Sequence, residues 1–260
     1  MTDDTERKAR IKQDFIDARG YWSFGWDPLL DMAPDYFAAY AKLSAVPWKT
    51  GTLDPKIKEL IYIAIDSSTT HMYEPGLRIH IRNALGYGAT RDEIMEVFQL
   101  TSVLGVHTVT MGVPALLDAM RSAGLGGEIQ SGELTPRQKE LKAAFIAARG
   151  YWSEMWDGVL ALSPDYFEAY AEFSSVPWKL GTLEPKVKEL IYVAIDASTT
   201  HLYEPGTRIH MANALKCGAT PAEIMEVLAL TSVLGVHTMA VGVPALLAEL
   251  KRAEEKKKSA

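Results

Sequence analysis

The chain has 260 residues, of which 48% are hydrophobic and 23% are charged, the balance of a folded globular protein. The formal charge is −6 and the only basic run is the terminal Lys256–Lys258, so neither nucleic acid nor an anionic membrane is an expected partner. A single cysteine, Cys217, excludes an intrachain disulfide and a thiol pair. The polar start and the short apolar runs predict a cytoplasmic protein without a membrane span.

Apolar residues recur at helical spacing along the first half of the chain, and no useful run has the period of a strand, so we expect an all-α fold. Prolines and glycines set the expected helix ends. In chain order the predicted helices cover 8–18, Pro34 to about Val46 (before Pro47), Pro55 to Ile65, Tyr73 to Gly86 or Gly88, Thr90 to Gly105, and 114–119. The aromatic residues interpreted as core or interface are Tyr21, Trp22, Trp26, Tyr36, Phe37 and Trp48.

The second half of the chain repeats the first. A shift of 130 residues, the separation of His71 from His201 (201 − 71), aligns 11–120 with 141–250 without a gap, and about two thirds of the positions are identical. We therefore expect two pseudo-two-fold related domains with two equivalent sites per chain. The predicted boundaries are a first domain at 1–123, a linker at 124–134, a second domain at 135–253 and a solvated tail at 254–260.

His80 lies about one turn into the fourth predicted helix, after Glu74 and Arg78. A helix N-terminus favours anions, so a carboxylate substrate could dock there beside His80 and Arg78. The alternative is a core histidine and a surface ion pair. The second copy keeps the set as Glu204, Arg208 and His210.

Glu59 interrupts the apolar third predicted helix, and Glu189 repeats it. Burial would raise the pKa of an unpaired carboxyl group into the range useful for acid–base catalysis near neutral pH. A salt bridge offers a second explanation. Its candidate partners are Lys56, Lys58 and Arg78.

Histidines and a carboxylate also form an inventory of possible metal ligands, because both groups bind zinc, manganese or iron. Their spacing does not match a known zinc helix such as H-E-x-x-H. The candidate ligands are His71, Glu74, His80 and His107 in the first copy and His201, Glu204, His210 and His237 in the second.

One pattern, H-x3-A-L-x-x-G-A-T-x-x-E-I-x-E-V, occurs at 80–97 and again at 210–227, each time after KELIY. With its flanks, about 55–117 and 185–247, it resembles the carboxymuconolactone decarboxylase and alkyl hydroperoxidase D superfamily. The resemblance implies an AhpD-like helical domain whose single-domain members form symmetric oligomers, often hexamers. Three tandem chains would then imitate a hexamer, so we expect a homotrimer.

The resemblance also implies site residues. The family histidine matches His80 and His210, and the family glutamate matches Glu59 and Glu189. The peroxidase branch has a C-x-x-C pair where this chain has Tyr-Glu-Pro-Gly twice, so thiol peroxidase activity is rejected. The decarboxylase branch also lacks these cysteines and removes carbon dioxide from a lactone acid of aromatic catabolism. The last catalytic candidates, His107 and His237, fall near a Gly-x-Pro turn of those enzymes.

We therefore expect a cofactor-free lyase or isomerase that acts on a small carboxylated catabolic intermediate by histidine–glutamate acid–base chemistry. The open alternatives are an enzyme with a divalent metal in each repeat and a non-catalytic oligomeric binding protein. The substrate-binding candidates are Tyr73, Glu74, Arg78, Tyr203, Glu204 and Arg208.

Overall fold

The computed structural model describes residues 2–125 and 133–259, and all regular elements in these ranges are helices. This confirms the all-α prediction and the tandem duplication. The first repeat contains α1 (Thr2–Arg19), η1 (Phe24–Trp26), α2 (Asp27–Met32), α3 (Pro34–Thr50), α4 (Pro55–Ser67), α5 (Glu74–Gly86), α6 (Arg91–Ser102), η2 (Val103–Val106) and α7 (His107–Ser122).

The second repeat follows the same order. It contains α8 (Pro136–Arg149), α9 (Met155–Leu162), α10 (Pro164–Leu180), α11 (Pro185–Ala197), α12 (Glu204–Lys216), α13 (Pro221–Ser232), η4 (Val233–Val236) and α14 (His237–Ser259). Most of the predicted linker, 126–132, lies outside the described residues. Within the described residues, the predicted tail continues α14, which ends at Ser259, and residues 254–258 are exposed.

Local signals explain where most helices begin. The capping box predicted at Thr90 and Glu93 is present at the start of α6. Two predicted helix limits were wrong: α3 continues through Pro47, and α7 begins at His107 and continues through Pro114. A proline removes only its own N–H bond and keeps a helical φ, so a helix can continue where packing stabilises it.

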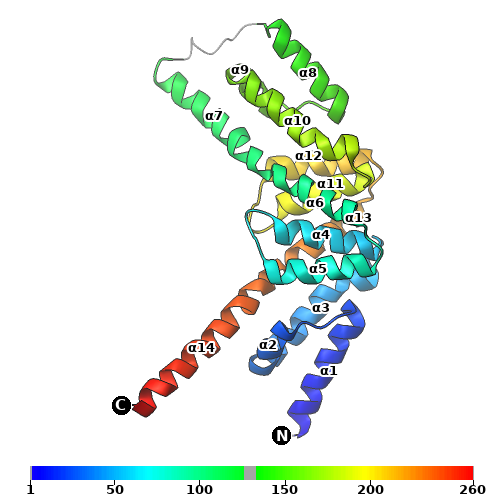
Figure 1. Cartoon of the computed structure of the whole chain (residues 1–260), viewed down its shortest axis with the longest axis vertical. Coiled ribbons are helices and arrows are strands. Elements are labelled where there is room, and N and C mark those ends of the chain that lie inside the picture. Colours follow the sequence, from blue (N-terminus) through cyan, green and yellow to red (C-terminus); the bar gives the residue numbers. More distant parts are fainter. Residues whose placement is uncertain (1, 126–132, 260) are drawn as a thin grey trace.

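The six helices α4–α6 and α11–α13 form the centre of the molecule, and the remaining helices form two arms (Figure 1). The central helices α4 and α11 are buried almost completely and pack against each other in one hydrophobic core. Burial on nearly all sides explains why both helices read as apolar around their whole circumference.

The last helix of each repeat packs against the first helices of the other repeat. In the lower arm of Figure 1, α14 of the second repeat lies against α2 of the first. Val236 and Val243 belong to the hydrophobic core of this arm. In the upper arm, α7 of the first repeat packs on α9 of the second. The spatial units therefore differ from the sequence repeats, because each arm combines residues of both.

Two continuous helical stretches, Arg91–Ser122 and Pro221–Lys258, are long and apolar enough to cross a membrane by length and composition. Both include core helices, in which Val97 and Val227 are fully buried. Core helices pass the same test, so these stretches are weak evidence for membrane spans.

Candidate functional site

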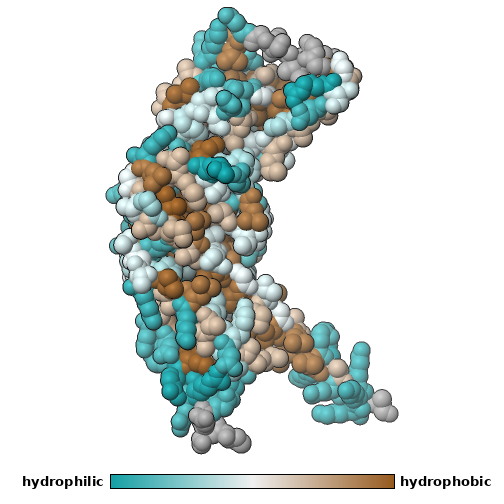
Figure 2. Space-filling view, turned by 180° about the vertical axis from the view of Figure 1, so that it is seen from behind, coloured by the Kyte–Doolittle hydropathy of each residue, from teal (hydrophilic) through white to brown (hydrophobic). Residues whose placement is uncertain are grey.

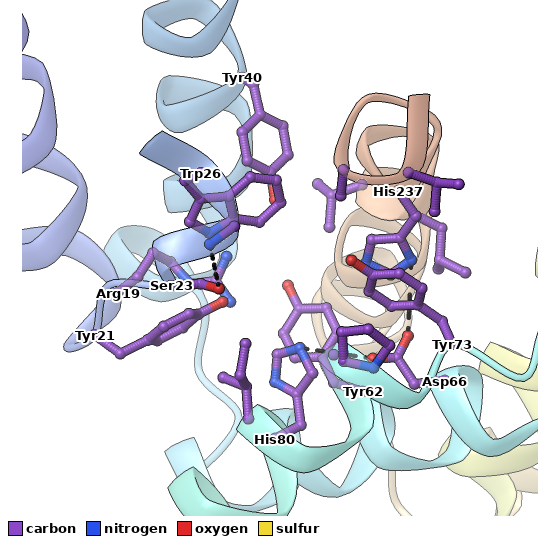
Figure 3. Close-up of a pocket in the computed structure, with 18 residues that line it drawn as sticks. Arg19, Tyr21, Ser23, Trp26, Tyr40, Tyr62, Asp66, Tyr73, His80 and His237 are labelled. Carbon is purple, nitrogen blue, oxygen red and sulfur yellow. Dashed lines mark hydrogen bonds and ion pairs between the residues drawn. The ribbon is translucent and has the colours of Figure 1, made fainter. Parts of the chain in front are cut away.

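A cavity of about 250 Å³ lies between the first repeat and the beginning of α14. Figure 3 shows the N-terminal segment on one side, α14 on the other, and His80 beside Tyr62 between them. The lining combines charged and aromatic groups of the first repeat with mainly apolar groups of the second. The lining residues are Arg19, Tyr21, Ser23, Gly25, Trp26, Tyr40, Tyr62, Asp66, Tyr73, Pro75, Gly76, Ile79, His80, Val233, Leu234, His237, Ala240 and Val241.

His80 is held by Glu59 on the neighbouring helix α4. The distance from His80 Nδ1 to Glu59 Oε2 is 2.6 Å, and Asn83 donates to the other carboxylate oxygen at 3.2 Å. Glu59 is fully buried, and the imidazole of His80 stacks on the ring of Tyr62 at 4.4 Å. The glutamate and the stacked ring fix the orientation of His80, so Nε2 remains available for chemistry.

The structure excludes the salt-bridge explanation of Glu59, because each of the candidate partners binds another carboxylate. These pairs are Lys56 with Glu93 at 2.7 Å, Lys58 with Glu226 at 2.8 Å, and Arg78 with Glu74 at 2.5 Å. Glu59 is therefore left to the histidine, as the resemblance implies, and Glu189 binds His210 in the same way at 2.6 Å.

Asp66 is a second buried carboxyl group beside the same imidazole. Its Oδ2 lies 4.0 Å from His80 Nε2 and has no hydrogen-bond partner. Burial raises the pKa of the Asp66 carboxyl group to about 7, although the charge of His80 opposes this shift. Gly76 packs directly on this carboxyl group, and a Cβ there would overlap Oδ2. The glycine of Tyr-Glu-Pro-Gly therefore makes room for Asp66.

His237, from the second repeat, completes one wall of the cavity. Its Nδ1 lies 2.8 Å from His71 Nε2, and both nitrogens lie within 4 Å of Asp66 Oδ1. The ring of Tyr73 stacks on His237 at 3.8 Å. Burial, together with the neighbouring histidines, lowers the pKa of His237 to about 3, and burial also lowers the pKa of His71. Both imidazoles are therefore neutral at pH 7. Neutral imidazoles are competent metal ligands.

The metal set predicted from the sequence was wrong in its membership. The structure does not bring together His71, Glu74, His80 and His107, because His107 belongs to the other arm and Glu74 is on the surface. Two histidines and one carboxylate do fit a divalent transition metal. Among the described residues, such groups are Asp66 with His71 and His237, and Asp196 with His107 and His201.

Comparisons with known proteins show which family has this sequence and fold. The carboxymuconolactone decarboxylase family matches residues 34–124 and again residues 164–255. The chain belongs to the carboxymuconolactone decarboxylase family. A solved structure of a candidate gamma-carboxymuconolactone decarboxylase subunit from Burkholderia xenovorans LB400 is 45% identical, with a TM-score of 0.89 over 95% of this chain and 98% of that one. No curated protein matches the chain. The family matches both repeats, and the neighbour matches nearly the whole tandem chain.

The charged residues expected to bind substrate in this family member lie outside the cavity. Arg78 is 72% exposed and pairs with Glu74, and Arg208 pairs with Glu204 in the second repeat. In the first turns of α5 and α12 these long side chains extend into solvent. This agrees with the alternative interpretation, a surface ion pair. Their neighbour Tyr73 does line the cavity, and Tyr203 lines its counterpart.

Arg19 is the cation that lines the cavity. It is 3% exposed, its guanidinium lies 5.0 Å from the ring of Trp48 and 5.3 Å from that of Tyr62, and its Nε has no hydrogen-bond partner. No ion pair joins it to a carboxylate among the described residues. A buried guanidinium without an anion is a strong anion-binding group. Its repeat in ARGYWS as Arg149 was the available sequence signal.

The second repeat forms a corresponding cavity with His107 in its wall. His107 Nδ1 lies 2.6 Å from His201 Nε2 and 3.8 Å from Asp196 Oδ1, and His107 lines the cavity together with His210. This cavity, however, has a volume of only about 40 Å³. The prediction of two equivalent sites was therefore right about the polar residues and wrong about the space around them.

Proposed function

We propose that the protein is a carboxy-lyase or isomerase that acts on a small cyclic carboxylate, such as a lactone acid of aromatic catabolism, in the cytoplasm. The observation that carries this proposal is the 2.6 Å bond between Glu59 and His80, which aims His80 Nε2 at Asp66 inside a substrate-sized cavity. Histidine and a carboxyl group whose pKa is near 7 can both exchange protons at neutral pH. No cofactor takes part in this proposal.

Arg19 supports the choice of an anionic substrate. Its guanidinium, which makes no ion pair with a carboxylate of the described residues, would bind the carboxylate, while the apolar wall of Val233, Leu234 and Val241 would receive the carbon ring. This arrangement places the charged end of the substrate near the aromatic residues around Arg19 and leaves its reactive carbon for His80.

Proton transfer by His80 would then serve either reaction. In decarboxylation, the carbon–carbon bond to the leaving carboxylate breaks, its electrons remain on the substrate as an enolate, and carbon dioxide leaves. Protonated His80 gives its Nε2 proton to the carbanionic carbon, and Asp66 resupplies it. Glu59 stabilises the imidazolium before the transfer, as a buried carboxylate does for a catalytic histidine. In isomerisation, the same groups would remove a proton and return it at another carbon.

Replacing both His80 and His210 with glutamine tests the proposal. We expect turnover of gamma-carboxymuconolactone, followed as carbon dioxide release, to fall by at least about 100-fold, the usual contribution of a general acid–base group. Circular dichroism should confirm that the double variant is folded. Unchanged turnover in the variant would refute the role of the histidines, and ligand binding without turnover in the wild type would favour the non-catalytic alternative.

The histidine–aspartate groups favour a second candidate, a metal-dependent enzyme. Asp66, His71 and His237 hold three donor atoms within 4.8 Å of one another, and the second repeat holds the same arrangement. Elemental analysis of protein purified without a histidine tag tests this candidate. About two equivalents of zinc, manganese or iron per chain, reduced to about one in His71→Ala and to none in His71→Ala/His201→Ala, would support it. Protein that is metal-free and fully active would exclude it.

A further inference from the structure

We propose that only the first cavity admits the substrate, and that Gly25 and Ala240 are the specificity-determining residues that keep it open. The second cavity is closed by the residues at the equivalent positions, Met155 and Thr110. This inference rests on the proposed function for the identity of the substrate, but its claim concerns which cavity a cyclic acid can enter.

The two cavities differ in size far more than in polar composition. Their volumes are about 250 and 40 Å³, although both contain a histidine held by a glutamate, an arginine and a histidine from the other repeat. The second cavity thus has about one sixth of the volume of the first. Both cavities have these chemical groups, but only the first has space for a ring.

Met155 is the first cause of this difference. It lines the second cavity at the position that Gly25 occupies in the first. Backbone geometry does not demand glycine there, because φ of Gly25 lies outside the positive range and a Cβ would meet only Ser23 Oγ, at an ordinary 3.5 Å. What Gly25 supplies is therefore the volume that the Met155 side chain takes up.

Thr110 is the second cause, and it also occupies a hydrogen-bonding group. Its hydroxyl lies 2.8 Å from the hydroxyl of Tyr203. In the first cavity the equivalent position is Ala240, which has no hydroxyl, and the Tyr73 hydroxyl has no hydrogen bond to any described residue. Tyr73 can thus donate to a bound ligand, whereas Tyr203 is 5% exposed and already paired.

The open cavity fits one class of ligand, a carboxylate on a ring-sized apolar body. Arg19 supplies the cation at one end, and Val233 and Val241 supply apolar wall from the second repeat. An acid without a ring would leave this wall exposed to water and should therefore bind more weakly.

Calorimetric titration of the full-length protein with benzoate, and with acetate for comparison, tests the inference. We expect one benzoate per chain in the wild type and tighter binding of benzoate than of acetate. The variant Met155→Gly/Thr110→Ala should bind two benzoates per chain. The reciprocal variant, Gly25→Met/Ala240→Thr, should lose at least about tenfold in affinity, or 1.4 kcal/mol.

Melting temperatures confirm that the exchanged variants are folded, and neither pair touches the glutamate–histidine contact. Two benzoates per chain in the wild type, no benzoate binding at all, or a stoichiometry that neither variant changes would each overturn the inference. Binding of benzoate does not require catalysis, so loss of the proposed function in the His80 and His210 test would leave this result intact, and the reverse also holds.

Discussion

Glu59 and Asp66 are seven residues apart on α4, a spacing that puts both carboxyl groups on one face of the helix. They flank the same imidazole, at 2.6 Å from Nδ1 and 4.0 Å from Nε2 of His80. The two carboxyl groups differ in their hydrogen bonds: Glu59 has two partners, whereas Asp66 Oδ2 has none. This difference separates a group that orients the histidine from one that holds a proton near neutral pH.

The raised pKa of Asp66 predicts a pH-dependent stability. Because its folded-state pKa, about 7, lies above the ordinary 3.8, the folded state binds the proton more tightly than the unfolded state. The associated stability is fully present below pH 4 and is lost as the pH rises to 7. Asp66→Asn should therefore raise the free energy of unfolding relative to the wild type at pH 8, by up to about 4 kcal/mol for roughly three pKa units, and not at pH 4.

Urea unfolding at the two pH values measures this effect. Glu172→Gln is the matched control, because Glu172 is exposed, and it should give the same small change at both pH values. A stability difference between Asp66→Asn and wild type that does not depend on pH would contradict the raised pKa.

Replacement by methionine should weaken ligand binding at Arg19 but not at Arg78. Arg19→Met should raise KM, or the Kd for benzoate, by at least about 30-fold, because removing one partner of a buried charge pair costs about 2–5 kcal/mol. Arg78→Met should leave both constants within about twofold, because Arg78 is exposed and paired with Glu74. Steady-state kinetics and calorimetry measure both. A larger effect at Arg78 than at Arg19 would restore the anchor that the sequence predicted.

At the scale of helices, the repeats are joined by two buried ion pairs. Lys58 on α4 binds Glu226 on α13 at 2.8 Å, and Lys188 on α11 binds Glu96 on α6 at 2.7 Å. Glu226 also accepts the backbone N–H groups of 52 and 53, which lead into α4. These contacts fix the central helices of one repeat to those of the other, and hence the position of α4 in the site.

Breaking one of these pairs should destabilise the whole chain. Lys58→Met leaves the Glu226 carboxylate buried without its cation, which typically costs about 3–5 kcal/mol. Removing both charges with Lys58→Met/Glu226→Gln should recover part of this loss. Urea unfolding measures the cost, and the exposed residue Arg137 provides the control Arg137→Met, which should unfold like the wild type. A Lys58→Met protein as stable as the wild type would refute the role of the pair.

At the scale of the molecule, the arms leave apolar side chains exposed. Figure 2 shows apolar surface along α14 up to its hydrophilic end. The exposed apolar residues of this helix are Val241, Leu246, Leu247 and Leu250, and those of α7 include Met111 and Leu116. Contiguous apolar surface of this kind is typical of protein–protein contacts. We propose that copies of the chain cover these faces in a homotrimer.

Light scattering should therefore give the mass of three chains for the wild type. Leu246→Asp/Leu250→Asp should shift the mass toward one chain, because two carboxylates would be buried at the contact. The variant Glu254→Lys/Glu255→Lys, near the hydrophilic end of the same helix, controls for a general effect of charge and should remain trimeric. A monomeric wild-type protein would contradict the proposal.

The sequence by itself determined the all-α duplicated fold, the family and the residues Glu59 and His80, because helical periodicity, capping and repeated motifs are local properties. It also held unused signals, since Arg19 and Asp66 recur in the second copy as Arg149 and Asp196. Only the tertiary structure decided which repeat supplies each histidine. Two similar repeats can make the same contact within a repeat or between repeats, and the sequence is the same in both cases. Because α7 and α14 each pack on the other repeat, their histidines line the cavity of that repeat, and residues of these helices help to set the volume of each cavity.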